Sequence, residues 1–444
     1  MIKRRIAFLA SSCVALGALI SLTSCGKKYD LVIYNWEDYI YEGTDEKDNK
    51  VEDNIVERFV KYYEEKYGKT LSVAYETFST NEEMYQQIKL GAVKPDVICP
   101  SDYMIQRMAN EDLLEPFSYN EETKKYGDSL NNWATYGSPY IMNRFASEKL
   151  DNGKSFLSYS VPYFWGTVGF TYDPDKISEE EVSTWECLWN TAKYSKKFSL
   201  KDSVRDSYVP AIFHVYKDEI AALDPNASDY NEKLNAIFNR CDDATLSKVE
   251  AALKEIKGKT VYGFEVDEGK DEIVKGTYWA NLAWSGDAVY AMDAAEQNEE
   301  PKTLNYALPE EGSNVWFDGW CMPKGSRTDV AEEFVNFISN PEIAALCMDS
   351  VGYTSPVVGE DIWELVNDWY AADEGVEYDT VDLSFFFGDS IEGKAEINVP
   401  KEERGRQFDA QYPTLEALNR CCIMKDFGEQ QEKVEAMWSR VKAA

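Results

Sequence analysis

Short apolar runs alternate with amphipathic segments in the part of the chain that follows residue 30. Three runs have the composition of β-strands, at 31–34, 71–75 and 96–99. Two segments between them, 52–67 and 82–90, carry apolar residues at helical spacing. Strands that alternate with helices in this way indicate an α/β layer with a parallel sheet.

The same alternation returns later in the chain, at 164–172, 281–290 and 305–322. The α/β class therefore extends over most of the sequence, and no repeat of solenoid period interrupts it. Charge-rich stretches at 265–275 and 358–405 separate the patterned segments, and we expect both to be surface insertions.

The N-terminus has the pattern of a bacterial export signal. Basic residues at 3–5 precede an apolar stretch at 6–20, which is too short for a stable membrane span. The next residues, 22–26, resemble the lipoprotein cleavage box, which implies a signal peptide of residues 1–24 and lipidation of Cys25. The alternative is cleavage nearby with Cys25 left as a thiol. No later apolar run is long enough to span a membrane, so we expect a soluble, lipid-anchored body outside the cytoplasm, in the periplasm or on the outer face of the cell membrane.

Charge and composition exclude several classes of protein. The 444 residues include 80 Asp plus Glu, 46 Lys plus Arg and one histidine, with a formal net charge of −34. Because a chain this acidic is repelled by phosphate backbones, nucleic acid is excluded as a partner. A single histidine, His214, argues against histidine-rich zinc sites and most histidine-based catalysis.

The cysteines do not form a disulfide pattern. Beyond Cys13 and Cys25, seven are scattered through the chain, an odd number in a large domain. We expect them to behave as small core residues, with the adjacent Cys421 and Cys422 as a buried pair on a helix.

Enzyme motifs are weak. The segment Gly258 to Thr260 resembles the end of a phosphate-binding loop, but Leu253 stands where its first glycine would be. The helical pattern around His214 favours a structural histidine. Neighbouring acids such as Glu310 and Glu311 could serve a glycosidase, but such pairs arise by chance in an acidic chain. We expect no cofactor, no metal and no catalytic residue.

Aromatic residues and carboxylates occur together at the predicted ends of strands. Four such clusters stand at 35–39, 101–103, 284–287 and 316–320. Ligands of open α/β sheets bind beyond the carboxyl ends of the strands, where these segments would meet. Indole faces and carboxylates together suit an organic cation. The alternative is that tryptophan packs and aspartate turns at strand ends without any ligand.

In the order of its motifs the chain resembles the spermidine/putrescine-binding proteins of bacterial ABC transporters. The segments that carry the resemblance are 34–39, 76–84, 96–103, 161–169, 184–189, 284–287, 309–319 and 352–356. They span nearly the whole mature chain; the extra length lies mainly near 130–160, 215–260 and 358–405.

The resemblance implies a two-lobed periplasmic-binding-protein fold of type II-like topology. Each lobe would be a mostly parallel sheet flanked by helices, and the chain would cross between lobes several times. We expect the first lobe to comprise 25–163 and 285–322, and the second to comprise 164–284 and 323–444, with the C-terminal helices in the last part.

The resemblance also implies the residues that line the ligand site. Trp36 and Tyr39 match positions that pack on an aliphatic chain, and Asp38, Asp206, Asp287 and Asp318 match carboxylates that meet amines. Ser101 and Tyr103 would supply hydroxyl groups, and Trp284 and Trp316 would supply aromatic walls. Glu37 is expected only to line the site. Two departures change its charge, since Glu37 replaces a small hydroxyl residue and Ser203 stands where some members have an acid.

The expected function is capture of a polyamine between the lobes and its delivery to an ABC permease. The partners would be the polyamine and the permease, with the membrane reached only through the lipid anchor, and the protein would be a monomer. One alternative keeps the fold but binds another cation or small solute. The other is a surface-anchored glycoside hydrolase acting through two carboxylates.

Overall fold

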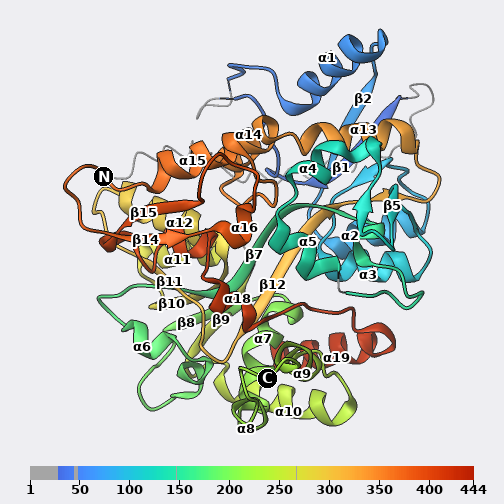
Figure 1. Ribbon diagram of the computed structural model, residues 1–444. Helices are drawn as coiled ribbons and strands as arrows, with labels where there is room; N and C mark the ends of the chain where they lie inside the picture. Colours follow the sequence, from blue (N-terminus) through green and yellow to red (C-terminus); the bar gives the residue numbers. More distant parts are fainter. Residues whose placement is uncertain (1–28, 45–48, 147, 267) are drawn as a thin grey trace.

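The computed structural model describes residues 29–44, 49–146, 148–266 and 268–444, which form a mixed α/β protein (Figure 1). The predicted signal peptide and the predicted lipidation site, Cys25, lie outside the described residues. Within the described ranges, the helices are all too short or too polar to cross a membrane.

The smaller of the two main sheets is parallel, as the alternating pattern predicts. Its strand order is β2 (Val73–Phe78), β1 (Leu31–Trp36) and β3 (Val97–Ile98). Each strand is followed by a helix or a loop that leads into one: α1 (Ile55–Tyr67), α2 (Asn81–Lys89) and α3 (Asp102–Asn110). Because the strands are parallel, the segments after β1 and β3 leave the sheet at the same edge.

The larger sheet is mixed. Its order over the described residues is β16, β12, β7, β10, β8 and β9, with β11 beside β7. The bounds are β7 (Val161–Tyr172), β8 (Phe198–Lys201), β9 (Val261–Glu265), β10 (Ala280–Trp284), β11 (Asn305–Ala307), β12 (Ser313–Trp320) and β16 (Cys421–Cys422). Strand β7 pairs antiparallel with β10, β11 and β12, whereas the other pairs are parallel. The antiparallel strand β7 therefore joins two parallel regions.

Two large hydrophobic cores share β7 and β12. Residues Val161 and Trp165 of β7 pack in the first core with β1 and α3, and Val168 and Tyr172 pack in the second core with β8 and α7. In Figure 1 these two long strands run side by side through the middle of the molecule, between the two groups of helices. We call the halves built around these cores the first and second lobes.

The remaining elements divide between the cores. The first core receives α4 (Asn131–Tyr136), α5 (Pro139–Ala146), α13 (Thr328–Ile338), α14 (Pro341–Val351), α15 (Glu360–Tyr370), α16 (Ser384–Phe387) and α18 (Leu415–Asn419). The second receives α6 (Glu179–Val182), α7 (Val204–Val215), α8 (Lys217–Ala221), α9 (Tyr230–Phe238), α10 (Asp243–Ile256) and α19 (Gln431–Ala443). A third, smaller core joins α11 (Glu268–Lys275), α12 (Ser285–Gln297), β11 and α17 (Gln407–Gln411). The short strands are β4 (Leu114–Glu115), β5 (Tyr119–Asn120), β6 (Lys125–Tyr126), β13 (Met322–Pro323), β14 (Tyr378–Asp382) and β15 (Glu396–Pro400).

The C-terminal quarter, 323–444, packs differently from the predicted division. Residues from Val330 to Val399 contribute to the first core, and residues from Cys422 to Val441 contribute to the second. The lobe boundaries at 163, 284 and 322 stay predictions, but 323–444 contributes to both cores.

Two local expectations were wrong. The charge-rich stretch 358–405 is not confined to the surface, because it inserts Phe386, Phe387 and Ile397 into the first core. Cys421 and Cys422 form strand β16 rather than part of a helix, and β16 pairs with β12. The seven cysteines of the described residues are all free thiols, and six of them are buried, as expected of core residues.

Candidate functional site

The first half of the candidate site forms where the loop after β1 meets β12. Trp36 ends β1, a two-residue turn follows, and the chain then buries Tyr39. The Tyr39 hydroxyl donates a 2.7 Å hydrogen bond to Oδ2 of Asp318, near the C-terminal end of β12. Ser101, just before α3, forms a β-bridge with Asp318. Three distant segments therefore meet around one buried carboxylate.

Ionisation of the Asp318 side chain is unfavourable in the folded protein. Burial raises its pKa from 3.8 to about 6, and hydrogen bonds from Ser101 and Tyr39 only partly oppose that rise. Asp102, in the first turn of α3, is buried beside it, and its pKa is raised well above the usual value by burial and by the charge of Asp318. Among the described residues, Oδ2 of Asp102 has no hydrogen-bond partner. This part of the site thus holds two buried carboxyl groups: Asp318, which accepts from neutral donors, and Asp102, whose pKa the charge of Arg205 partly lowers.

The second half of the site lies in the second lobe, where α7 begins and β10 ends. The indole Nε1 of Trp284, the last residue of β10, donates a 2.9 Å hydrogen bond to Oδ1 of Asp206. Asp206 stands in the first turn of α7, where Ser203 caps the helix by accepting from the Asp206 backbone N–H. Burial raises the pKa of Asp206, and hydrogen bonds from Ser203 and Trp284 together with the charges of Lys201 and Arg205 reduce the shift. The hydrogen-bond donors of this carboxylate are neutral, and the two cations act on it without forming an ion pair.

Asp287 differs because it is paired with a lysine of the same chain. Nζ of Lys201, at the end of β8, lies 2.7 Å from Oδ2 of Asp287, and both side chains are almost completely buried. Tyr353 donates a 2.9 Å hydrogen bond to the other oxygen, and Nζ of Lys270 lies 3.9 Å from it. Although burial alone would raise the pKa of Asp287, the charges of Lys201 and Lys270 bring it below the usual value. Asp287 is therefore ionised and internally neutralised.

Tyr353 joins the two halves. Its ring centroid lies 5.7 Å from that of Tyr39 and 5.7 Å from that of Trp316, both in edge-on geometry. The Trp316 ring in turn lies against Gly166 of β7, where an added Cβ would be 2.8 Å from an indole carbon. A continuous series of contacts thus connects Asp206, through Trp284, Lys201, Asp287, Tyr353 and Tyr39, to Asp318. We call this series the aromatic–carboxylate network.

The structure brings seven of the predicted site residues into this network. They are Tyr39, Ser101, Asp206, Trp284, Asp287, Trp316 and Asp318. Trp36 and Tyr103 lie at its margin: Trp36 packs on Phe78, and Tyr103 lies beneath the guanidinium of Arg205, 3.7 Å from the ring centroid. No described contact joins either of them to Asp206, Asp287 or Asp318, although the backbone N–H of Tyr103 donates to Oδ1 of Asp102.

Glu37 and Asp38 are exposed in the turn after β1, outside the network. Asp38 adopts a left-handed conformation, with φ of 51°, which suits a tight turn. The lining role of Glu37 and the amine contact of Asp38 stay predictions. His214 stacks on Trp189 and pairs with Glu186, as expected of a structural histidine.

Sequence reasoning missed Lys201, Asp102 and Tyr353. Asp102 and Tyr353 stood inside segments that carried the family resemblance, at 96–103 and 352–356, and Lys201 stood five residues before the predicted site residue Asp206. A signal for Lys201 was available, since a lysine at the end of an apolar strand next to an acid-rich turn is out of place unless it is paired. The partner of Lys201 is 86 residues away, so the sequence did not indicate the pair.

The fold and the site define a class, namely a two-lobed α/β binding protein whose aromatic and acidic residues meet between β-strand ends. Residues 58–375 match the family described as bacterial extracellular solute-binding protein, and the chain belongs to this family. The family consists of solute-binding proteins of transport systems.

Curated relatives and solved structures agree with this assignment. The chain is 22% identical over 367 residues to the putrescine-binding periplasmic protein PotF of Escherichia coli, covering 78% of this chain and 86% of that protein. It is 24% identical to the putrescine-binding periplasmic protein SpuD of Pseudomonas aeruginosa, and the match covers 78% of this chain and 85% of SpuD. Its fold is similar to the spermidine/putrescine ABC transporter substrate-binding protein PotD of Streptococcus pneumoniae, with a TM-score of 0.59, 25% identity, and coverage of 93% and 98%.

Proposed function

We propose that this protein is the substrate-binding component of an ABC transporter and that its ligand is a polyamine. The relatives named for putrescine binding, and the solved structure named for spermidine and putrescine transport, support this ligand class. The chain belongs to a family of transport proteins, which supports binding followed by delivery to a permease, without covalent chemistry, as the proposed activity.

The observation that carries the proposal is the state of Asp206 and Asp318. Each is a desolvated carboxylate that accepts hydrogen bonds only from neutral donors and has no ion pair among the described residues, although the charges of Lys201 and Arg205 act on Asp206 from farther away. A buried anion without a cation is costly, and an ammonium group removes that cost. A charge-assisted hydrogen bond contributes about 1.5 to 3 kcal/mol, and contact with an indole face adds about 0.5 to 2 kcal/mol. Alkyl segments between the amines would lie on the rings of Trp316 and Trp284.

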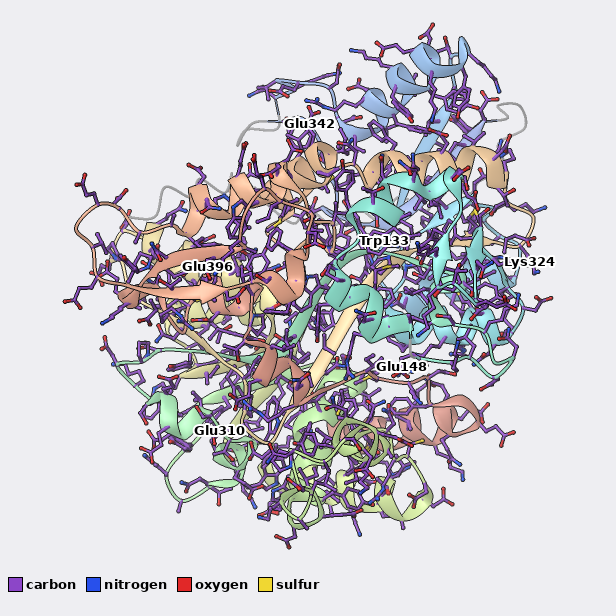
Figure 2. All side chains as sticks on the ribbon, in the orientation of Figure 1. Trp133, Glu148, Glu310, Lys324, Glu342 and Glu396 are labelled. Atoms are coloured by element: carbon purple, nitrogen blue, oxygen red, sulfur yellow. The ribbon has the colours of Figure 1, made fainter. Side chains whose placement is uncertain are left out.

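Contacts between the lobes suggest how the site closes. The Arg205 guanidinium of the second lobe stacks on Tyr103 of the first. Gln106 of α3 donates a 3.0 Å hydrogen bond to the carbonyl of Met424. Glu148, labelled in Figure 2, lies 3.8 Å from Nζ of Lys425, at the lower edge of the first lobe. Closure would exclude water from the network and strengthen its charged contacts, and the permease would recognise the closed form.

The location and assembly belong to the same proposal. Lipidation at Cys25 would hold the protein on the outer side of the membrane, where one acyl-modified residue tethers the body without a spanning helix. The protein would act as a monomer that meets the permease through its closed lobes.

A ligand screen followed by titration calorimetry tests the proposal. A ligand present at about 1,000 times its Kd stabilises the folded state by about 4 kcal/mol, which gives a clear rise in Tm. Putrescine, cadaverine, spermidine and spermine are compared with sugars, amino acids and inorganic cations. We expect a rise only with polyamines, and no effect from any polyamine would refute the proposed ligand class.

A matched pair of variants shows whether the network is the site. Asp206→Asn removes a network carboxylate, and Asp202→Asn removes a carboxylate on the same turn that accepts instead from Trp438 and Lys442. We expect Asp206→Asn to weaken polyamine binding by about 10-fold or more and Asp202→Asn to leave it unchanged. Equal effects of the two variants would place the ligand elsewhere.

The screen also separates the alternatives. If the ligand is another cation or small solute, that compound will raise Tm and no polyamine will. A separate assay tests the hydrolase alternative: a carboxylate-dependent hydrolase would release reducing sugar from a glycan, and Asp318→Asn would lower that turnover.

A further inference from the structure

Lys201 makes, within the chain, the contacts that the sequence assigned to a ligand amine at Asp287. Its Nζ lies 2.7 Å from Oδ2 of Asp287, 3.0 Å from the carbonyl oxygen of Val266, and 3.7 Å from the ring centroid of Trp284. The lysine side chain is only 3% exposed. A carboxylate, a carbonyl oxygen and an indole face around one ammonium are the groups that bind an alkylammonium ligand.

This placement has an energetic reason. Lysine is almost never fully buried unless it is paired, because its ammonium loses strong hydration. Here Asp287, Val266 and Trp284 replace that hydration together. The hydroxyl of Tyr353 and the more exposed Lys270 occupy the other oxygen of Asp287, so both oxygens already have partners within the chain.

The charge of the network follows from this pairing. Its carboxylates and amines are Asp206, Asp287, Asp318 and Lys201. The lysine forms an ion pair with Asp287, and its charge also lowers the pKa of Asp206. Asp102 is buried, and burial raises its pKa well above the usual value, which disfavours its charged form. The charge of Arg205 is shared with Asp426, whose carboxylate lies 3.4 Å away. Asp206 and Asp318 remain as the network acids for which the described residues supply no ion pair.

We propose that Lys201 is a built-in occupant of one amine subsite and that it makes the site selective for diamines over triamines and tetraamines. This inference rests on the proposed function. Two uncompensated carboxylates match the two ammonium groups of an α,ω-diaminoalkane. A third ligand ammonium would have to displace Lys201 from Asp287 or lie next to the Lys201 ammonium. In the second case the two positive charges would repel each other in a desolvated space.

The principal test is Lys201→Met, which keeps the length and the apolar stem of the side chain but removes its charge. Putrescine and spermidine are titrated calorimetrically into the wild type and the variant at pH 7.5. We expect the affinity for spermidine to rise relative to that for putrescine by about tenfold, because the freed Asp287 and Trp284 can then hold a third amine. An unchanged ratio would overturn the inference.

Lys270→Met is the matched control. It removes a positive charge 3.9 Å from the same carboxylate, but Lys270 is 26% exposed and also lies over the ring of Tyr290. We expect its ratio of affinities to stay within about threefold of wild type, since a partly solvated charge has a small effect. A change as large as that of Lys201→Met would show that net charge alone sets the preference, which would overturn the occupied subsite.

The double variant Lys201→Met, Asp287→Asn keeps the test decisive if the single variant does not fold, because it removes both charges of the buried pair together. Under the inference, a third amine needs the free carboxylate of Asp287. The double variant lacks that carboxylate and should therefore prefer putrescine over spermidine as wild type does, whatever its affinity for putrescine. A rise of about tenfold in the relative affinity for spermidine would overturn the inference, because it would arise without Asp287.

Failure of the inference is distinguishable from failure of the proposed function. If polyamines bind wild type and Asp206→Asn weakens them, but the Lys201 variants leave the ratio unchanged, only the selectivity role fails. If no polyamine binds any of these proteins, both fail.

Discussion

Asp318 offers the sharpest test of the network, because its contribution to stability and its contribution to binding should have opposite signs. Replacing it with asparagine removes a buried charge while keeping the size of the side chain. We expect Asp318→Asn to raise the Tm of the protein measured without polyamine and to abolish most of the polyamine response. If Asp318 had only a structural role, the substitution would instead lower Tm.

The magnitude follows from the shift of the Asp318 pKa from 3.8 to about 6. That difference corresponds to about 3 kcal/mol against the ionised carboxylate in the folded protein. Because the folded pKa is raised, the protein is stabilised below pH 3.8 and loses that stability as the pH rises to about 6. The variant should therefore exceed wild type by up to about 3 kcal/mol at pH 7.5 and by nothing near pH 4.

Binding of an amine requires the ionised form of Asp318, so ligand and proton compete. With a pKa of about 6, the affinity of wild type for putrescine should fall about tenfold between pH 7 and pH 5. Asp318→Asn should weaken binding about 10- to 150-fold at pH 7.5, the equivalent of one charge-assisted hydrogen bond, and should lose this pH dependence.

Thermal melts without ligand and calorimetric titrations with putrescine, both from pH 4.5 to 8, measure these quantities. Tyr39→Phe is a useful companion, because it removes one donor to the ionised carboxylate and should move the midpoint of the binding profile to higher pH. Wild-type affinity that is flat from pH 7 to 5, or a variant that is less stable than wild type at pH 7.5, would refute the reasoning.

Three further predictions concern the surroundings of the network. Arg205→Met removes the guanidinium that stacks on Tyr103 between the lobes. It should therefore lower polyamine affinity about 5-fold and shift the solution scattering toward a more open form. Unchanged scattering would contradict this prediction. Gly286→Ala should lower the free energy of unfolding by about 1 to 3 kcal/mol in urea melts, since its Cβ would lie 2.5 Å from the ring of Tyr353, and a neutral effect would show that the ring can move. Among the seven described thiols, only the partly exposed Cys241 should react quickly with a thiol reagent in the native protein at pH 8, and fast reaction of several would mean that the cores open readily.

The local patterns in the sequence predicted much of the first lobe and the composition of the site. The alternation of strands and helices at 31–99 is confirmed with shifts of a few residues at the ends. It succeeded because burial of one face of a strand or helix imposes a period that neighbouring residues reveal. The same kind of argument failed for 358–405, where β14 and β15 pair with each other and nearby aromatic residues enter the first core. Because the exposed positions of this segment are highly charged, the pattern of its buried apolar positions was not recognised.

The sequence by itself therefore determined which residue types gather at the ends of strands, and through its resemblance to a family it determined which segments form the site. Only the tertiary structure decided which of these residues meet. Tyr39 reaches Asp318 across 279 positions and Lys201 reaches Asp287 across 86, whereas Asp38, in an equally acidic segment, is left in solvent. The physical reason is that these pairs depend on which strands lie side by side. Strand β7 pairs with β12, which carries Asp318, and with β10, which precedes Asp287, and β10 pairs with β8, which ends at Lys201.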